Sequence, residues 1–176
     1  MALVVRKLEP SHPVRHFDCG DEELNQFLLR YAVQNQERHM YGTTYVAFLP
    51  NHDEIIGYYT LASSSIPRLD LPQASVQGQP KYPHIPCILL ARIAIAKRHA
   101  GKGHGEALIR DCMTNALLAA NICNARYIIA DAYIEKVNWY ERYGFIQIPG
   151  GTDPKYRKMF LDLRVVKAAI SRGRNG

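Results

Sequence analysis

A glycine-rich turn between an apolar stretch and an amphipathic one constrains the fold of this chain most strongly. Residues 88–96 are apolar apart from Arg92, which is typical of a buried strand. Gly101, Gly103 and Gly105 follow at alternate positions, and a helical pattern begins directly after them. Glycines let backbone N–H groups come close to a ligand, and a helix start adds unpaired N–H donors and a positive dipole. Residues 88–110 therefore predict a strand, a turn suited to a pyrophosphate, and a helix.

The segments after the turn extend this unit. Apolar residues recur on one side of the expected helix, and residues 126–132 predict another strand, buried on both faces. A strand, helix and strand of this length imply a right-handed parallel crossover. The apolar face of the helix consists of Leu108, Ile109, Cys112, Met113, Ala116, Leu117 and Ala120.

The N-terminal third predicts a strand, a helix and a hairpin. Residues 3–8 are a strand candidate, the acidic residues 18–23 open a helix, and residues 43–49 and 54–61 form an antiparallel hairpin. The helix is expected to bury Leu24, Phe27, Leu28, Tyr31 and Ala32. Its solvated side and continuation are expected to carry Gln26, Arg30, Gln34, Gln36, Glu37, Arg38 and His39.

The remaining segments complete one domain with a mixed sheet. Residues 63–86 hold five prolines without a sustained period, so we expect a long loop with one helical turn. Residues 136–143 predict a short helix with Gly144 as its C-cap, and residues 145–148 and 158–163 finish the sheet. The polar tail at 171–176 is expected to fray. Hairpin strands followed by a βαβ unit give an α/β domain over residues 1–176.

Composition narrows the class of protein. A net charge of +6 favours an anionic partner without saying whether it is a nucleotide cofactor, RNA or a membrane. The four cysteines form no C-x-x-C pair, which argues against a disulfide framework or a zinc site, and no metal is expected. The N-terminus lacks the apolar run of a secretory signal, and Arg92 interrupts the longest apolar run. A cytoplasmic protein without a membrane segment is the simplest interpretation.

Two common phosphate motifs do not fit the turn. A P-loop needs G-x-x-x-x-G-K-[ST], and no lysine here is followed by Ser or Thr. The dinucleotide fingerprint G-x-G-x-x-G fails because Glu106 or Leu108 stands where its last glycine belongs. The pattern that remains is Arg98-x-x-Gly101-x-Gly103, directly after a strand.

That pattern resembles the [QR]-x-x-G-x-[GA] motif of the GCN5-related N-acetyltransferases, the GNAT family, which binds the pyrophosphate of acetyl-CoA. Residues 138–145, an asparagine and aromatics followed by Gly-Phe, resemble the last motif of the family. Residues 17–28, 34–36, 43–46 and 90–95 are similar to the acetyltransferase toxins of type II toxin–antitoxin systems; Ala91 departs from the glycine found in many of them. The resemblance covers essentially the whole chain. It implies an α/β (α+β) GNAT fold, with a mixed central sheet of about six to seven strands flanked by helices.

The resemblance also implies roles for individual residues. The backbone of Ile93 and Ile95 would lie against the pantetheine arm, with an N–H near the thioester carbonyl. The pyrophosphate would be surrounded by Arg98, Ala100, Gly101, Gly103, His104 and Gly105. For Arg98 and Lys102 the alternative is exposed loop charge, and for Ile93 and Ile95 it is a plain core strand. Asn138 would contact the cofactor arm, unless it is only an exposed residue at a helix start.

The chemistry requires a proton donor for the departing thiolate, and Tyr140 occupies the position of the general acid in the family. The alternative for Tyr140 is an aromatic that fills the core; Tyr143 is the stronger candidate for packing. No general base stands out. An α-amino group has a pKa of about 8 and a lysine side chain a pKa of about 10.4, so much more of the α-amino group is neutral near pH 7 and a general base is less necessary. Arg92 is expected to pair with Asp131, to lie exposed at the strand end, or to contact substrate.

The toxins that this chain resembles acetylate the α-amino group of aminoacyl-tRNA and block translation. The resemblance implies a homodimer and a small antitoxin, of the ribbon-helix-helix class, that binds operator DNA. Candidate tRNA-facing residues are Arg30, Arg38, His39, Lys155, Arg157 and Lys158, with Arg92 at the substrate. Two alternatives stay open: an acetyltransferase for a small amine or a protein N-terminus, and an acetyl-CoA-binding regulatory module without activity.

Overall fold

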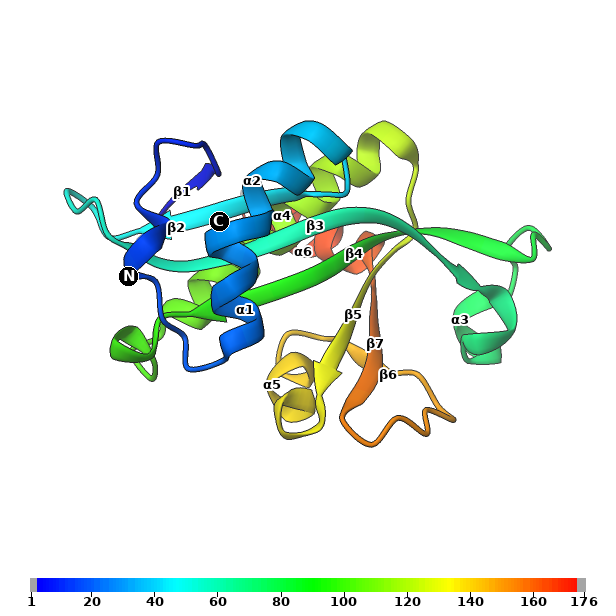
Figure 1. Ribbon diagram of the computed structural model, residues 1–176. Coiled ribbons are helices and arrows are strands. Elements are labelled where there is room, and N and C mark those ends of the chain that lie inside the picture. Colours follow the sequence, from blue (N-terminus) through cyan, green and yellow to red (C-terminus); the bar gives the residue numbers. More distant parts are fainter. Residues whose placement is uncertain (1–2, 174–176) are drawn as a thin grey trace. The chain divides into compact units, whose positions relative to one another are not determined.

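The computed structural model describes residues 3–173, and Figure 1 shows their helices and strands. These residues group into two compact units. The first unit contains residues 3–62 and 90–113, and the second contains residues 63–89 and 114–173. We describe each unit by itself. None of the helices in the described part of the chain is long and apolar enough to cross a membrane.

The described residues form one mixed sheet of seven strands in the order β1-β2-β3-β4-β5-β7-β6, together with helices. This confirms the predicted fold class. The strands are β1 (Val4–Lys7), β2 (Thr43–Phe48), β3 (Ile55–Pro67), β4 (His84–Ile95), β5 (Tyr127–Tyr133), β6 (Ile146–Gln147) and β7 (Tyr156–Asp162). The α-helices are α1 (Glu22–Gln26), α2 (Ala32–Gln34), α3 (Gln73–Val76), α4 (His104–Cys123), α5 (Val137–Glu141) and α6 (Leu163–Gly173).

The first helical segment starts where the acidic stretch predicts. The carboxylate of Asp21 caps α1 by accepting hydrogen bonds from the backbone N–H groups of Glu23 (2.9 Å) and Leu24 (3.2 Å). The segment then continues through a π-helical turn at Phe27–Tyr31, α2, and a second π-helical turn at Asn35–His39. Helical structure therefore runs without a break to the residue before Met40.

Two side chains of this segment contradict the predicted faces. Tyr31 is 52% exposed rather than buried, because a π-helical turn bonds each residue one position further along and rotates the face that an α-helical period predicts. Gln36 is buried rather than solvated. Its amide nitrogen donates to the carbonyl oxygen of Leu8 (2.9 Å), and its amide oxygen accepts from the N–H of Thr44 (3.1 Å). Gln36 thus supplies hydrogen bonds to the backbone beside β1 and β2.

The predicted hairpin is confirmed as β2 and β3, which pair antiparallel. Tyr58 and Tyr59 are both fully buried, and because they are consecutive their side chains leave opposite faces of β3. The Tyr58 hydroxyl donates to the carbonyl oxygen of Leu24 in α1 (2.9 Å). The Tyr59 hydroxyl donates to a carboxylate oxygen of Asp111 in α4 (2.5 Å). Helices therefore cover both faces of this strand in the first unit.

The second unit has its own core, built around β5 and β7. These strands pair antiparallel along their whole length, and β6 pairs with β7 on the other edge. Tyr127 packs edge-on against Phe160, with ring centroids 5.6 Å apart. Its hydroxyl donates to the carbonyl oxygen of Ser75 (2.7 Å), so the connection that carries α3 is fastened to the sheet.

The prediction of a loop from 63 to 86 is wrong at both ends. β3 continues to Pro67 and β4 begins at His84, so the connection is residues 68–83. Exposed and covered positions alternate from Ala62 to Pro67, but serines hide this period in the sequence. The Arg68 guanidinium orders the connection by donating to the carbonyl oxygens of Val76 (2.7 Å) and Pro80 (2.8 Å).

Helix α6 was not predicted. Asp162 ends β7, and its carboxylate accepts from the N–H of Arg164 (2.9 Å), as an N-cap residue does. Leu163 and Val166 of α6 are three positions apart and both are buried, as residues on one face of a helix are. The prediction of a frayed tail fails for residues 171–173, which are helical, and residues 174–176 lie outside the described residues.

The close approach of β3 and β4 in the first unit depends on Gly57. A Cβ atom on Gly57 would lie 2.9 Å from the carbonyl oxygen of Ala94 and 2.7 Å from Cδ1 of Ile95. We expect Gly57→Ala to lower the free energy of unfolding by about 1–3 kcal/mol through overpacking. Denaturant unfolding measures this, with Gly151→Ala as a control, because the nearest atom to a Cβ there is 3.9 Å away. Equal stability of the two variants would contradict the expectation.

Candidate active-site elements

The glycine turn between β4 and α4 has open backbone and open space. Gly101 and Gly103 adopt φ angles of +71° and +82°, which glycine tolerates best, and a Cβ on either would meet no atom within 4 Å. The carbonyl oxygen of Gly103 accepts from the N–H groups of Glu106 (3.2 Å) and Ala107 (3.4 Å), so the α4 ladder begins there. The first N–H groups of a helix have no partner within it and can bind an anion. The turn therefore fits a phosphate group.

Ion pairs and a backbone hydrogen bond hold residues 97–99, directly before this turn, in place. Arg98 forms an ion pair with Glu54, and Nε2 of His99 lies 3.2 Å from the same carboxylate. The N–H of Lys97 donates to the carbonyl oxygen of Asp18 (2.9 Å). Arg98 is therefore partly neutralised, although its side chain stays half-exposed. Glu54 could not be found from local spacing, because residues 54 and 98 lie far apart in the chain.

His104 opens α4, but its imidazole points into the protein. The residue is 2% exposed, its ring lies edge-on to that of His99 at 5.9 Å, and its Nδ1 has no hydrogen-bond partner within residues 3–173. Burial lowers the pKa of His104, and the neighbouring His99 and Lys102 lower it further. The contact of His104 with a pyrophosphate stays a prediction, and because the imidazole is buried only the backbone N–H of His104 could make it. Ala100 is exposed beside the turn, Gly105 is half-buried, and Lys102 is exposed.

At the end of β4 the side chains of residues 92–95 leave alternate faces of the strand. Ile93 and Ile95 are half-buried on one face, and Ile95 packs towards Gly57 of β3. Arg92 belongs to the other face, where its guanidinium lies 3.8 Å from the ring centroid of Phe27. This cation–π contact accounts for a cation in an apolar strand without a carboxylate. Pairing of Arg92 with Asp131, which belongs to the second unit, stays a prediction.

Tyr140 lies in the second unit, at the end of α5, where a Schellman turn fixes it. Gly144 adopts a φ of +87°, and its N–H donates to the carbonyl oxygen of Glu141 (2.9 Å), while the N–H of Phe145 donates to that of Tyr140 (3.3 Å). The rings of Tyr140 and Phe145 pack edge-on at 5.3 Å, the apolar contact that accompanies this motif. The predicted C-cap is confirmed, and it explains why Gly-Phe follows the tyrosine.

The residues around Tyr140 differ in how deeply they are buried. Tyr140 itself is buried, and Trp139 packs edge-on against it at 5.0 Å and against Tyr143 at the same distance. Tyr143 is half-buried, which agrees with its predicted packing role. Asn138 is exposed. The turn, Ile93 and Ile95 belong to the first unit, and Asn138 and Tyr140 to the second.

The predicted tRNA-facing cations are divided between the two units. Arg30, Arg38 and His39 are exposed in the first unit. In the second unit, Arg157 and Lys158 are consecutive in β7, so their side chains leave opposite faces. The Lys155 ammonium lies 5.2 Å from the ring centroid of Tyr133 and 5.1 Å from that of Tyr156. A contact of these residues with RNA stays a prediction.

Cys19, Cys87, Cys112 and Cys123 are free thiols. Burial raises the pKa of the Cys87 thiol to about 12, so it is protonated at neutral pH. Across residues 3–173 no three His, Cys, Asp or Glu side chains are grouped so that they could hold a metal ion.

Comparisons with known proteins agree on one family. The sequence profile of the acetyltransferase (GNAT) domain matches residues 40–147. The chain is 27% identical to the tRNA-acetylating toxin of Mycobacterium tuberculosis (strain ATCC 25618 / H37Rv) over 157 residues, covering 89% of this chain and 90% of the toxin.

Solved structures are similar over almost the whole chain. AtaT complexed with acetyl-methionyl-tRNAfMet is 26% identical with a TM-score of 0.84, covering 96% of this chain and 99% of that one. AtaTR bound with AcCoA is 26% identical with a TM-score of 0.79, covering 96% and 98%. The KacTA–DNA complex is 26% identical with a TM-score of 0.75, covering 97% and 99%.

The buried imidazole of His104 predicts a loss of stability in mild acid. The folded pKa is lowered from the ordinary value of 6.5, so the unfolded chain binds the proton more readily. The free energy of unfolding should therefore be unaffected by His104 above about pH 6.5 and should fall as the pH drops below it. The hydrogen bond from Lys97 helps to lower the pKa of Asp18 to about 2. Asp18 therefore changes the free energy of unfolding only in a more acidic range than His104 does.

Denaturant unfolding between pH 7.5 and 5 tests this expectation. His104→Gln should flatten the pH dependence, because it removes the titrating group. His52→Gln changes an exposed histidine and should leave the dependence as it is. A slope in His104→Gln equal to that of the unaltered protein would show that another group is responsible.

Proposed function

Because the chain belongs to the acetyltransferase (GNAT) family, we propose that it transfers the acetyl group of acetyl-CoA to the α-amino group of an aminoacyl-tRNA. It would thereby act as a toxin that inhibits translation. The tRNA-acetylating toxin of M. tuberculosis and the AtaT complex with acetyl-methionyl-tRNAfMet support this choice of acceptor. The AtaTR structure with AcCoA supports the choice of acetyl donor.

The single observation that carries the proposal is the open glycine turn at the start of α4. The positive φ angles of Gly101 and Gly103 and the empty space around both leave room for a pyrophosphate on backbone N–H groups. Ala100, Gly105, the backbone N–H of His104 and the half-exposed guanidinium of Arg98 would complete this site. Ile93 and Ile95 offer backbone groups to the pantetheine arm, and Asn138 is assigned to the same arm.

The reaction needs a proton for the leaving thiolate. The α-amino nitrogen attacks the thioester carbonyl carbon, the C–N bond forms, and the C–S bond breaks with its electron pair passing to sulfur. We assign the proton that the thiolate takes up to the hydroxyl of Tyr140, and the proton lost from nitrogen passes to water. A backbone N–H of β4 would stabilise the negative charge on the carbonyl oxygen. An α-amino group has an ordinary pKa of about 8, so no strong base is required.

The partners follow from the same proposal. The acceptor is a charged tRNA, with Arg92, Arg30, Arg38 and Lys158 as candidate contacts. The KacTA–DNA complex supports an antitoxin that holds the toxin on DNA. For this chain we infer a small antitoxin of the ribbon-helix-helix class that binds the operator, a homodimeric toxin and a cytoplasmic location.

Labelled acetyl-CoA and charged tRNA test the proposed reaction directly. The expected result is label on the aminoacyl group, and a set of single isoacceptors identifies the preferred amino acid. Transfer to polyamines or peptide N-termini with no label on tRNA would instead establish the alternative acetyltransferase. No transfer to any acceptor would favour a regulatory module.

Removing the hydroxyl of Tyr140 tests the proton donor. Tyr140→Phe should lower kcat at least 100-fold, the usual contribution of general acid catalysis, with the KM for acetyl-CoA nearly unchanged. Tyr143→Phe is the matched control, because it removes a hydroxyl three residues away and should keep full activity. Equal kcat values for the two variants would rule out Tyr140 as the acid.

Filling the turn tests the acetyl-CoA site. Gly101→Val places a β-branched side chain at a φ of +71° and in the open space, and should raise the KM for acetyl-CoA about tenfold or more. Gly150→Val introduces the same side chain at a φ of +85°, also with open space, but far from the turn in sequence and in the other unit. A similar KM in both variants would argue against this turn as the site.

A further inference from the structure

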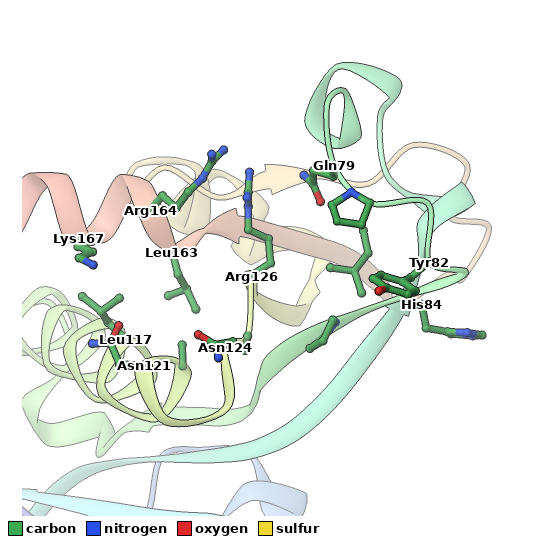
Figure 2. A pocket seen from close by; sticks show the side chains of 15 residues that line it. Gln79, Tyr82, His84, Leu117, Asn121, Asn124, Arg126, Leu163, Arg164 and Lys167 are labelled. Atoms are coloured by element: carbon green, nitrogen blue, oxygen red, sulfur yellow. The ribbon is translucent and has the colours of Figure 1, made fainter.

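The second unit contains a cavity that none of the predicted site residues lines. Its volume is about 390 Å³, within the range of small-molecule sites. The end of α4, the start of α6, β4 and the 68–83 connection all contribute to its lining (Figure 2). The apolar part of the lining includes Ile85, Pro86, Leu117, Ala120 and Leu163.

The cavity is positively charged. Arg126, Arg164 and Lys167 line it, and none of its lining residues is acidic. Both guanidiniums pair with Asp162, which lies beside the cavity, at 3.1 Å from Arg126 and 2.9 Å from Arg164. Burial opposes ionisation of Asp162, but hydrogen bonding to Arg164 and the charges of both arginines lower its pKa. One carboxylate against three cations leaves a net charge of about +2 at neutral pH, which attracts an anion.

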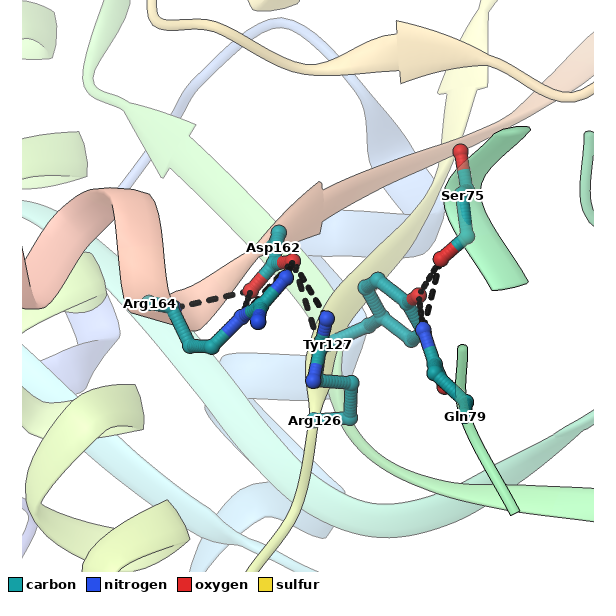
Figure 3. A network of polar contacts seen from close by, with 6 residues as sticks. All are labelled: Ser75, Gln79, Arg126, Tyr127, Asp162 and Arg164. Atoms are coloured by element: carbon teal, nitrogen blue, oxygen red, sulfur yellow. Dashed lines mark hydrogen bonds and ion pairs between the residues drawn. The ribbon is translucent and has the colours of Figure 1, made fainter. Parts of the chain in front are cut away.

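Two of the three cations, Arg126 and Arg164, are held in place by Asp162 before any ligand arrives. The side chain of Arg126 is only 24% exposed, and it bonds Asp162 through both Nε (3.2 Å) and Nη2 (3.1 Å) (Figure 3). Its backbone N–H donates to the carbonyl oxygen of Pro86 (2.9 Å), and its carbonyl oxygen accepts from the N–H of Leu163 (3.1 Å). Arg126 therefore ties β4 to the start of α6, and an anion here would meet a preformed site.

The other polar and aromatic groups suit a nucleobase. The side-chain amides of Asn121 and Asn124 have no partner within the part of the chain that the structure describes, and each carries donors and acceptors. The side-chain NH2 group of Gln79 donates to the Ser75 carbonyl oxygen (2.6 Å) and to the Tyr127 hydroxyl oxygen (2.7 Å), which leaves the side-chain amide oxygen as an acceptor (Figure 3). Tyr82, 69% exposed, offers an aromatic surface at the rim on which a base can stack.

We infer that this cavity binds an unpaired nucleotide of the tRNA, with a phosphate at Lys167 and Arg164 and the base against Tyr82 and the amides. The inference rests on the proposed function, because it takes the nucleotide from the proposed substrate. Single-stranded RNA is recognised by this combination of cations, stacking aromatics and amide hydrogen bonds. The cavity would thus be an RNA contact in addition to the tRNA-facing cations that were predicted from the sequence.

Binding of deacylated tRNA, measured by fluorescence anisotropy over a range of salt concentrations, tests the inference. Lys167→Ala should weaken binding severalfold and reduce the salt slope by about one, because one phosphate contact is lost. Arg172→Ala is the matched control, since it removes an exposed cation from the same helix outside the cavity, and should change binding less than twofold. Tyr82→Ala should weaken binding about tenfold, while Tyr82→Phe keeps the stacking surface and should bind as the unaltered protein does.

Adenosine 5′-monophosphate, measured in the same assays, distinguishes a nucleotide of the tRNA from a free mononucleotide as the ligand of the cavity. If Lys167→Ala and Tyr82→Ala weaken tRNA binding while their controls do not, the inference is supported. If tRNA binding is unchanged in both variants, the inference is wrong, and a loss of mononucleotide binding would then assign the cavity to a free nucleotide. An acidic peptide that binds there, with tRNA binding unchanged, would overturn the inference equally.

The acetylation assay keeps this inference distinguishable from the proposed function. If the unaltered protein acetylates aminoacyl-tRNA but the cavity variants show the same KM for tRNA as Arg172→Ala, only the inference fails. If the unaltered protein acetylates no aminoacyl-tRNA, the proposed function fails, and the binding of deacylated tRNA still reports on the cavity.

Discussion

Two consecutive tyrosines in β3 hold the first unit together. Tyr58 and Tyr59 are fully buried on opposite faces of one strand, so each hydroxyl needs a partner inside the protein. Tyr58 finds a carbonyl in α1 and Tyr59 a carboxylate in α4, and both helices are thereby fixed on the strand. The neighbouring Gly57 lets β4 approach closely at Ala94 and Ile95, the last residues of that strand before the segment that leads to the glycine turn. The part of the proposed acetyl-CoA site in the first unit therefore rests on packing in which Gly57 contacts Ile95, one of the residues assigned to the pantetheine arm.

The second unit uses a charged network in a comparable way. Asp162 ends β7, caps α6 and pairs with both Arg126 and Arg164. One carboxylate thus fixes a helix start and two guanidiniums. The pair with Arg126 is largely shielded from water, whereas the pair with the exposed Arg164 is screened as a surface pair is. After β5 and α5, the Schellman turn at Gly144 holds the ring of Tyr140 against that of Phe145. The unit therefore has one ordered element for the proposed chemistry and another for the proposed RNA contact.

Much of the fold could be predicted because it depends on local patterns. The hairpin, the apolar strands, the glycine turn and the helix after it follow from side-chain periodicity and turn residues. The Asp21 and Gly144 caps follow from chemistry within a few residues. The prediction failed where a local pattern was masked or altered. Serines hid the alternation at the end of β3, and a π-helical turn exposed Tyr31 where an α-helical period would bury it.

By itself, the sequence determined the α/β class, the open glycine turn, the position of Tyr140 before Gly-Phe, and the resemblance to one acetyltransferase family. These features are encoded within short windows, where spacing alone carries the information. Only the tertiary structure decided that Gln36 is buried, that the imidazole of His104 faces inward, that Glu54 pairs with Arg98, and that Arg126, Arg164 and Lys167 surround one cavity. Each of these depends on residues far apart in the chain, whose contact no periodicity records.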